Sequence, residues 1–270
     1  NRDFPKALTA FERRYEKLGK ALCETKREQA KKIIGTYKKV FDLEAQLKWL
    51  KALNSECPDT QSIQWEGLVY LKQKKDALAI ETFNQALQKF PKSGLVDEVL
   101  YLIARTHLIM GSWDEALVTF DKILTGYPGG EVRAVSAFRK ALIFVIQRKW
   151  TEAIQLLEPL FGDSSSEVAV GAKYWCAFAY LMIGERQNAF ALYDNIAWVH
   201  RDSYYGLLLE DKGLIAPASR NPAGIELHRF TTDTSVLSKP ERQLLWRGEY
   251  YLRAGFPKFA VNQFNQIAWQ

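Results

Sequence analysis

Apolar residues recur along this chain with the period of an α-helix. In the clearest segment the core-facing positions fall three and four residues apart and share one helical face: Leu100, Ile103, Ala104 and His107. Gly111 stops this helix, and a second stripe precedes Pro128, at Ala116, Phe120 and Ile123. The pattern predicts a helical hairpin over 100–128, in which Ser112 and Glu115 form a capping box at the start of the second helix.

The hairpin pattern repeats along the chain at a nearly constant interval. Small residues mark the first helix of each unit, with gaps of 37, 37, 36 and 71 residues: Gly67, Ala104, Ala141, Ala177 and Gly248. A second series has the same gaps in the helix that follows: Ala79, Ala116, Ala153, Ala189 and Ala260. Periods in this range are typical of stacked helical hairpins. The last gap is close to two periods, which predicts an insertion before the final hairpin.

The order of the repeated positions (small, turn, small, aromatic, proline) resembles the tetratricopeptide repeat. We therefore predict an all-α fold, a right-handed α-superhelix of tetratricopeptide-like helical hairpins. Its expected parts are basic N-terminal helices over 1–60, helical hairpins over 61–200, and an inserted helix with the final hairpin over 201–270. The last part is expected to continue the same superhelix. Most of the repeated residues are interpreted as core packing between neighbouring hairpins.

Positive charge is concentrated at the N-terminal end of the chain. The net charge is +6, and residues 1–60 hold fourteen Lys or Arg against nine Asp or Glu, whereas the rest holds 23 against 22. A one-sided apolar stripe accompanies this charge: Phe4, Leu8, Phe11, Tyr15, Leu18 and Leu22. The basic residues form either a solvated face of packed helices or a surface that attracts an anionic polymer. No zinc-finger spacing or RNA-recognition motif is present, so nucleic acid is not the expected partner.

The sequence offers few groups for catalysis or metal binding. It has no phosphate-binding GxxxxGK[ST] loop, no GxSxG, HExxH or GxGxxG motif, and only three widely separated histidines. We assign no catalytic residue, no cofactor and no metal site, and we interpret His107 as a structural residue with satisfied hydrogen bonds. The longest apolar run is about ten residues, shorter than the roughly 20 that cross a bilayer, so no membrane span is expected.

Three cysteines are present, with no CxxC pattern that would indicate a zinc site or a redox motif. Cys176 lies in a repeat helix and is expected to be buried. Cys23 and Cys57 could pair in an oxidising compartment if two N-terminal helices run antiparallel. The chain begins without Met or a signal peptide, and we interpret it as a mature or trimmed product, so the missing leader does not argue for the cytoplasm.

The insertion carries two adjacent tyrosines before a glycine, in the segment Ser203-Tyr204-Tyr205-Gly206-Leu207-Leu208. It follows a helix that begins Ala172-Lys173-Tyr174-Trp175 and a turn that reads Gly184-Glu185-Arg186-Gln187-Asn188-Ala189. This order resembles the superhelical domain of soluble lytic murein transglycosylases, over about a third of the chain. The Glu-Ser and G-L-M-Q patterns of that family's catalytic domain do not occur here, so no catalytic residue is transferred, and whether the parent protein is an enzyme stays open.

The resemblance implies a periplasmic region, with outer-membrane association left open, that engages peptidoglycan glycan strands. Such a region would support a lysozyme-like catalytic domain, in cis or as a separate chain. The candidate glycan contacts are Trp198, Arg201, Tyr204 and Tyr205. Their alternative role is packing between helices.

Two other functions stay open. A tetratricopeptide-type scaffold would bind peptides or proteins in its groove, and a first-helix face lined by Asn, Lys and Arg would favour that function. Those positions are mostly Leu, Ile, Tyr and Phe, which weakens it. A free-standing hydrolase or nucleic-acid enzyme would need a cluster of polar groups that the sequence does not show.

Overall fold

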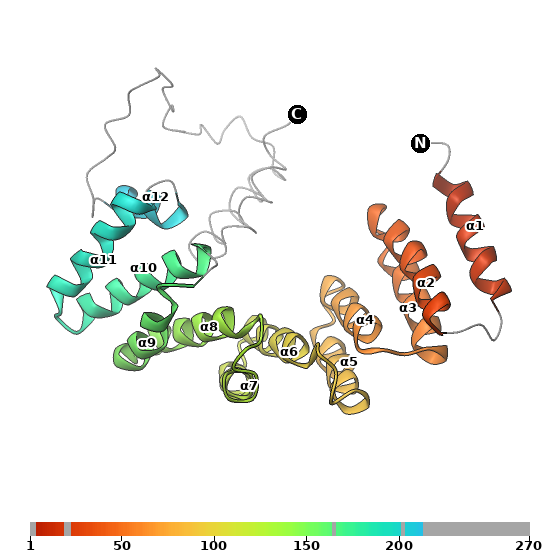
Figure 1. The fold of residues 1–270 in the computed structure, drawn as a ribbon, viewed down its shortest axis with the longest axis horizontal. Coiled ribbons are helices and arrows are strands. Elements are labelled where there is room, and N and C mark those ends of the chain that lie inside the picture. Colours follow the sequence, from red (N-terminus) through yellow and green to blue (C-terminus); the bar gives the residue numbers. More distant parts are fainter. Residues whose placement is uncertain (1–3, 19–22, 164–165, 201–202, 213–270) are drawn as a thin grey trace, which may run out of the picture. The chain divides into compact units, whose positions relative to one another are not determined.

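The computed structural model describes residues 4–18, 23–163, 166–200 and 203–212, and all regular elements in these ranges are helical (Figure 1). The predicted all-α superhelix of helical hairpins is therefore confirmed. The helices up to residue 126 are α1 (Phe4–Lys17), α2 (Cys23–Lys39), α3 (Leu43–Glu56), α4 (Thr60–Lys72), α5 (Asp76–Lys89), α6 (Val96–Met110) and α7 (Trp113–Gly126). Those that follow are α8 (Arg133–Ile146), α9 (Trp150–Leu157), the 3-10 turn η1 (Glu158–Leu160), α10 (Ser166–Met182), α11 (Arg186–Val199) and α12 (Tyr204–Asp211).

The chain divides into two compact units, Asn1–Leu192 and Tyr193–Gln270. In the first unit, helices that are neighbours in sequence pair as hairpins: α4 with α5, α6 with α7, and α8 with α9. Each hairpin also packs against the next along the chain, and the buried residues form successive clusters along this described array. The predicted final hairpin at 241–270 lies outside the described residues, and the predicted boundaries after residues 60 and 200 stay predictions.

The array contains one more hairpin than the repeat analysis recognised. Helices α2 and α3 pair in the same way as those that follow. Ala30 of α2 is fully buried and lies 37 residues before Gly67, so it belongs to the series of small residues. The second series of small residues does not reveal this hairpin. The fourth residue of α3 is Gln46, whereas the fourth residue of α5 is the small residue Ala79. Gln46 is buried and donates through Nε2 to the carbonyl oxygen of Asp42, 3.1 Å away.

Polar contacts and a disulfide tie α2 to the end of α3. Cys23 and Cys57 are joined, with Cα atoms 5.3 Å apart, which confirms the pairing that the sequence left open. Beside them, Lys26 pairs with Glu56, and the Nε of Arg27 lies 2.8 Å from the Asp59 carboxylate. These two cations therefore hold helices together.

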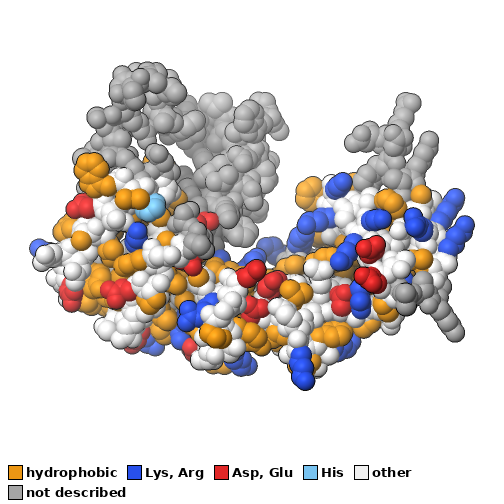
Figure 2. Space-filling view, viewed as in Figure 1, with side chains coloured by type: hydrophobic (Ala, Val, Ile, Leu, Met, Phe, Trp, Pro, Cys, Tyr) orange, Lys and Arg blue, Asp and Glu red, His pale blue; other side chains and the backbone are white. Residues whose placement is uncertain are grey.

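Other Lys and Arg side chains gather on the surface of the helices α1 to α4 (Figure 2). Lys31, Lys32, Lys38 and Lys39 are exposed, and the Nζ of Lys31 lies 5.7 Å from the centre of the Trp65 ring. Some basic side chains near the N-terminus are thus exposed to solvent, whereas Lys26 and Arg27 form ion pairs that link helices.

Helix α1 is attached through its apolar stripe and one carboxylate. Leu8, Phe11 and Tyr15 pack onto the core of the first hairpins. The Tyr37 hydroxyl of α2 and the Trp49 Nε1 of α3 both donate to Oε1 of Glu12, over 2.7 and 3.3 Å. Burial, together with the hydrogen bond to Glu12, raises the pKa of Tyr37 to about 12, so this hydroxyl stays a donor at neutral pH.

Small residues let an aromatic ring fill the space between the two helices of a hairpin. A Cβ atom added at Gly67 of α4 would lie 2.3 Å from Cε1 of Phe83 on α5. The Phe83 side chain is fully buried, and the next hairpin repeats the arrangement with buried Ala104 and Phe120. The separation of α4 and α5 therefore depends on the absence of a side chain at Gly67.

The turn inside each hairpin contains a residue in the left-handed backbone region. These residues are Phe41, Lys74, Gly111, Arg148 and Gly184, with φ values of 58°, 61°, 77°, 59° and 88°. Gly111 confirms the predicted helix stop. A side chain in this region costs free energy that glycine avoids. Three of the five turns therefore carry local strain.

The predicted capping box at Ser112 is wrong. Ser112 occupies the N-cap of α7, but its side chain makes no capping hydrogen bond there. Its ψ is 72°, and its own N–H bonds to the carbonyl oxygen of His107. A capping box needs an extended N-cap residue, and one forms before α4, where Asp59 has a ψ of 170° and pairs with Ser62.

We expect Gly67→Ala to lower the free energy of unfolding by about 1–3 kcal/mol, because the added Cβ forces the buried Phe83 ring to move. Chemical denaturation of the purified chain measures the loss. Gly126→Ala is the matched control, since a Cβ on this last residue of α7 meets nothing within 4 Å. Equal stability of Gly67→Ala and the wild type would contradict the close packing described above.

Arg148→Gly should raise the free energy of unfolding by roughly 0.5–1 kcal/mol, because glycine adopts the left-handed conformation without a Cβ clash. The reverse change, Gly111→Ala, should lower it by a similar amount. Thermal unfolding of both variants gives the two signs. A less stable Arg148→Gly protein would mean that the Arg148 side chain stabilises the turn by more than the strain costs.

Candidate functional site

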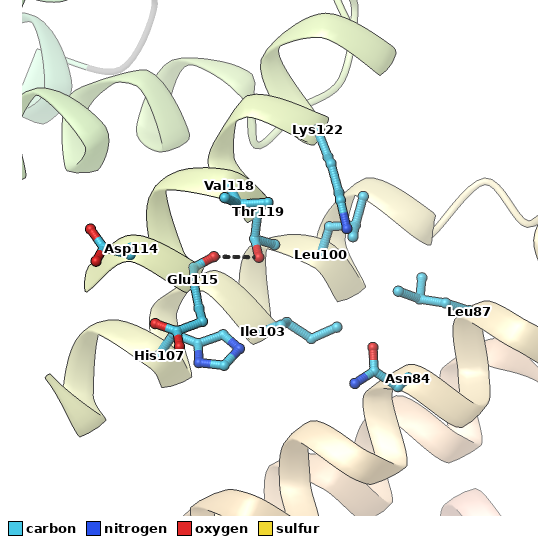
Figure 3. Close-up of a pocket in the computed structure, with 10 residues that line it drawn as sticks. All are labelled: Asn84, Leu87, Leu100, Ile103, His107, Asp114, Glu115, Val118, Thr119 and Lys122. Carbon is cyan, nitrogen blue, oxygen red and sulfur yellow. Dashed lines mark hydrogen bonds between the residues drawn. The ribbon is translucent and has the colours of Figure 1, made fainter. Parts of the chain in front are cut away.

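A cleft of 460 Å³ opens between α5, α6 and α7 in the first unit (Figure 3). Its apolar part is formed by one residue from α5, two from α6 and one from α7: Leu87, Leu100, Ile103 and Val118. Figure 3 shows the α5 and α7 side chains approaching from opposite sides, with Leu100 and Ile103 between them. Helices α5 and α7 are each the second helix of a hairpin, and α6 is the first helix of the later hairpin. Because α6 lies between α5 and α7, it holds them apart and leaves a cleft.

Polar side chains surround the apolar part of the cleft: Asn84, His107, Asp114, Glu115, Thr119 and Lys122. Thr119 is internally satisfied, because its hydroxyl donates to the carbonyl oxygen of Glu115 over 2.8 Å (Figure 3). A second hollow of 550 Å³ on α5 shares Asn84 with the cleft. The cleft therefore offers apolar contact in its floor and charges of both signs at its edge.

His107 differs from its predicted role as a satisfied core residue. It is half-buried, and its Nδ1 atom is buried without a hydrogen-bond partner in the described part of the chain. A buried polar nitrogen without a partner costs free energy. Because His107 lines the cleft, a ligand there could supply the missing partner.

A second polar site lies on α6 and α8. The Nε of Arg139 on α8 donates to the hydroxyl of Tyr101 on α6 over 2.8 Å, and its guanidinium carbon lies 5.8 Å from the Tyr101 ring centre. Arg105 follows Tyr101 by four residues, so both lie on one side of α6. Glu98 precedes them on the same side and accepts a 3.3 Å hydrogen bond from Nε2 of Gln64 on α4. We call this surface (Glu98, Tyr101, Arg105 and Arg139) the arginine face.

Arg105 is the unbalanced cation of the arginine face. Burial lowers its pKa, Tyr101 opposes this effect, and the positive charge of Arg139 adds to the lowering. Within the ranges that the structure describes, Arg105 makes no hydrogen bond or ion pair. A half-buried guanidinium whose neighbour is a second arginine is electrostatically unfavourable.

The cleft and the arginine face use opposite sides of one helix. Leu100, Ile103 and His107 line the cleft, whereas Tyr101 and Arg105 belong to the arginine face. At 100° per residue, these two sets point in roughly opposite directions from the α6 axis. A ligand in the cleft therefore need not contact a ligand on the arginine face.

The sequence-predicted contact residues lie at the end of α11 and in α12. Trp198 is 88% exposed, whereas Tyr205 is buried and Tyr204 is half-buried. The rings of the two tyrosines meet edge to face, with their centres 5.1 Å apart. Arg201 lies outside the described residues. The glycan-binding role of these four residues stays a prediction, and the burial of Tyr205 agrees with its alternative role in packing.

Sequence reasoning missed both sites on α6. Tyr101 and Arg139 are 38 residues apart, and their pairing follows from the contact between successive first helices. The repeat period was the available signal, because 38 residues is one period plus one residue. No cluster of His, Cys, Asp and Glu in the described ranges could hold a metal ion, and no helix there is long and apolar enough to cross a membrane.

The family comparison matches the repeat region. A model of the Iml2/Tetratricopeptide repeat protein 39 family matches residues 43–203, which is more than half of the chain. No curated protein is significantly similar to the chain.

Solved structures give the same architecture. The quorum sensor NprR from B. thuringiensis, in its apo form, has 16% identity and a TM-score of 0.58, over 97% of this chain and 82% of that one. A tetratricopeptide repeat protein from Parabacteroides merdae has 14% identity and a TM-score of 0.57, over 89% and 91%. MamA from Desulfovibrio magneticus has 14% identity and a TM-score of 0.53, over 65% and 96%. At such low identity the likeness shows the fold alone.

Together the comparisons show a tetratricopeptide-like helical repeat protein. They offer no support for a lytic murein transglycosylase, for peptidoglycan binding or for a lysozyme-like partner domain. The scaffold, which the sequence left as the alternative, is the function that they favour.

Tyr205→Ala should lower the free energy of unfolding by roughly 3–5 kcal/mol, because it removes a buried aromatic ring. Trp198→Ala, at an exposed position, should change it by less than about 0.5 kcal/mol. Thermal unfolding of the two variants makes the comparison. An unchanged melting temperature for Tyr205→Ala would place its ring on an exposed binding surface.

Proposed function

We propose that this chain, which belongs to the Iml2/Tetratricopeptide repeat protein 39 family, is a scaffold that binds a segment of a partner protein in the α5–α7 cleft. The cleft carries this proposal. Its apolar floor can bury one or two side chains of a partner, while its charged edge can orient the partner backbone.

The exposure of Val118 supports binding in the cleft. Val118 belongs to α7, lines the cleft and is 57% exposed, whereas Ala116 and Phe120 of the same helix are fully buried. An exposed β-branched side chain beside Leu87 and Leu100 offers apolar surface that a partner would remove from water. A partner side chain placed here would extend the existing core between α5 and α7.

His107 supports the same site by a polar argument. A partner backbone N–H or carbonyl group in the cleft would satisfy the buried Nδ1 atom, whichever tautomer the imidazole adopts. Asp114 and Glu115 lie near the start of α7, and Lys122 lies two turns further along it. We therefore expect a bound segment with a basic residue toward the start of α7 and an acidic residue toward Lys122.

The test is a peptide selection against the 270-residue chain, followed by measurement of the dissociation constants of the selected peptides. Val118→Arg should weaken their binding by at least tenfold, about 1.4 kcal/mol, because a charged side chain would fill the cleft. Leu78→Arg is the matched control, since Leu78 is an exposed apolar residue of α5 that does not line the cleft. It should leave the dissociation constants unchanged.

Circular dichroism of both variants should show unchanged helix content, because both positions are exposed. Peptides that bind Val118→Arg as tightly as the wild type would place the interaction outside the cleft. A selection that yields no specific peptide would count against the scaffold function itself.

A further inference from the structure

The exposed large apolar side chains of the first unit are concentrated at the turns inside the hairpins. In the described part of this unit, most of them lie at, or within two positions of, a turn residue with a left-handed backbone, and three lie elsewhere: Leu78, Val118 and Phe190. Because each hairpin packs against the next, successive turns follow one edge of the array. The exposed apolar surface therefore gathers at that edge.

Phe41, in the turn between α2 and α3, is the most exposed of these residues. It is 86% exposed, and Val40 beside it is 51% exposed. Its φ of 58° lies in the left-handed region, which a bulky side chain adopts at a cost in free energy, whereas later turns have Gly111 and Gly184 at this position. The exposed ring gains little packing within the fold to offset this cost. A partner surface that removes the ring from water would offset it.

Lysines flank this apolar tip. Lys38 and Lys39 end α2 directly before it, and the neighbouring turn adds three more: Lys72, Lys74 and Lys75. The two turns are adjacent, because Nε2 of Gln73 donates to Oε1 of Glu44 over 2.8 Å. All five lysines are exposed, and within the described ranges none of them forms an ion pair. We call this surface the turn patch (Lys38, Lys39, Val40, Phe41, Lys72, Lys74 and Lys75).

Three carboxylates beside the turn patch reduce its positive charge without cancelling it. Asp42 accepts a hydrogen bond from the backbone N–H of Ala45 and caps α3. Glu44 accepts the hydrogen bond from Gln73, and Asp76 lies in the first turn of α5, where the helix dipole favours a negative charge. Five lysines against three carboxylates leave the patch with an excess of two positive charges.

An apolar tip flanked by cations matches the surface of a bilayer that contains anionic lipids. Lysine side chains are attracted to the lipid headgroups, and an apolar or aromatic side chain can enter the boundary with the acyl chains. A nucleic acid would supply phosphates for the lysines, but it offers no apolar layer for Val40 beside Phe41. The combination of residues therefore favours a lipid surface.

We propose that the turn patch docks this chain on an anionic lipid surface, with Phe41 and Val40 inserted and the lysines at the headgroups. The patch shares no residue with the α5–α7 cleft, so docking does not depend on peptide binding there. A chain held by this edge would present its cleft to a partner near the membrane.

The test is co-sedimentation of the 270-residue chain with vesicles made of equal parts of phosphatidylglycerol and phosphatidylcholine. Vesicles of phosphatidylcholine alone provide the neutral comparison. The chain should bind the anionic vesicles, and rising salt should weaken this binding because it screens the lysines. The neutral vesicles should bind it at least tenfold more weakly, since they lack the headgroup charge.

Phe41→Gly separates insertion from folding. It removes the apolar ring, so binding to the anionic vesicles should weaken by about tenfold. It also relieves the left-handed strain, so the melting temperature should rise. A loss of binding in a more stable protein cannot result from unfolding. Phe190→Ala is the matched control, because it removes an exposed phenylalanine ring of α11 and should leave binding unchanged.

A pair of double variants tests the charge. Lys38→Gln/Lys39→Gln should weaken binding by at least about tenfold. Lys89→Gln/Lys92→Gln removes the same charge from exposed lysines at the opposite end of α5 from Lys75, and it should have a much smaller effect. Val118→Arg should bind vesicles as the wild type does, and Phe41→Gly should bind the cleft peptides normally, so failures of the two sites can be told apart.

Four results would overturn the proposal. Two are equal binding to neutral and anionic vesicles, and unchanged binding in Phe41→Gly. The third is an equal loss in the two double-lysine variants, which would show that overall charge attracts the chain to the vesicles. The fourth is tighter binding to a DNA duplex than to the anionic vesicles, which would make the turn patch a nucleic-acid surface.

Discussion

The contact between a small residue on one helix and a fully buried large side chain on the next sets the helix separation within the hairpins. Gly67 and Phe83 make this contact in one hairpin, and Ala104 and Phe120 occupy the same positions in the next. Because each hairpin buries its apolar surface only against its neighbours, a change in one helix separation would be transmitted along the chain. The Cys23–Cys57 disulfide and the Lys26–Glu56 ion pair stabilise the N-terminal end of this array.

The same contact leaves α6 with two accessible sides. Ala104 packs against α7. Ile103 lines the cleft, and Tyr101 contacts Arg139 of α8. The cleft presents an apolar floor with polar edges, and the arginine face presents a cation that lacks a neutralising partner among the described residues. One helix thereby carries two surfaces of different chemistry.

The repeat could be predicted because packing imposes it on the sequence: a hairpin needs small residues at Ala104 and Ala116 and a ring at Phe120. Features that depend on one local angle were not predictable, and the absent cap at Ser112 is the example. The hairpin of α2 and α3 was not predicted because Gln46 stands where the pattern requires a small residue. Gln46 can be buried there because its side chain donates a hydrogen bond to the carbonyl oxygen of Asp42. The two sites depend on pairs such as Tyr101 and Arg139, whose meeting requires the helix register as well as the period.

A double-mutant cycle at Gly67 and Phe83 tests the central claim most directly. Gly67→Ala, Phe83→Leu and the double variant would be compared by chemical denaturation. If the ring and the missing side chain share one space, the smaller Leu relieves the clash, and the double variant loses less than the sum of the single losses by roughly 1 kcal/mol or more. Strictly additive losses would show that the two positions do not determine each other, and would contradict the account.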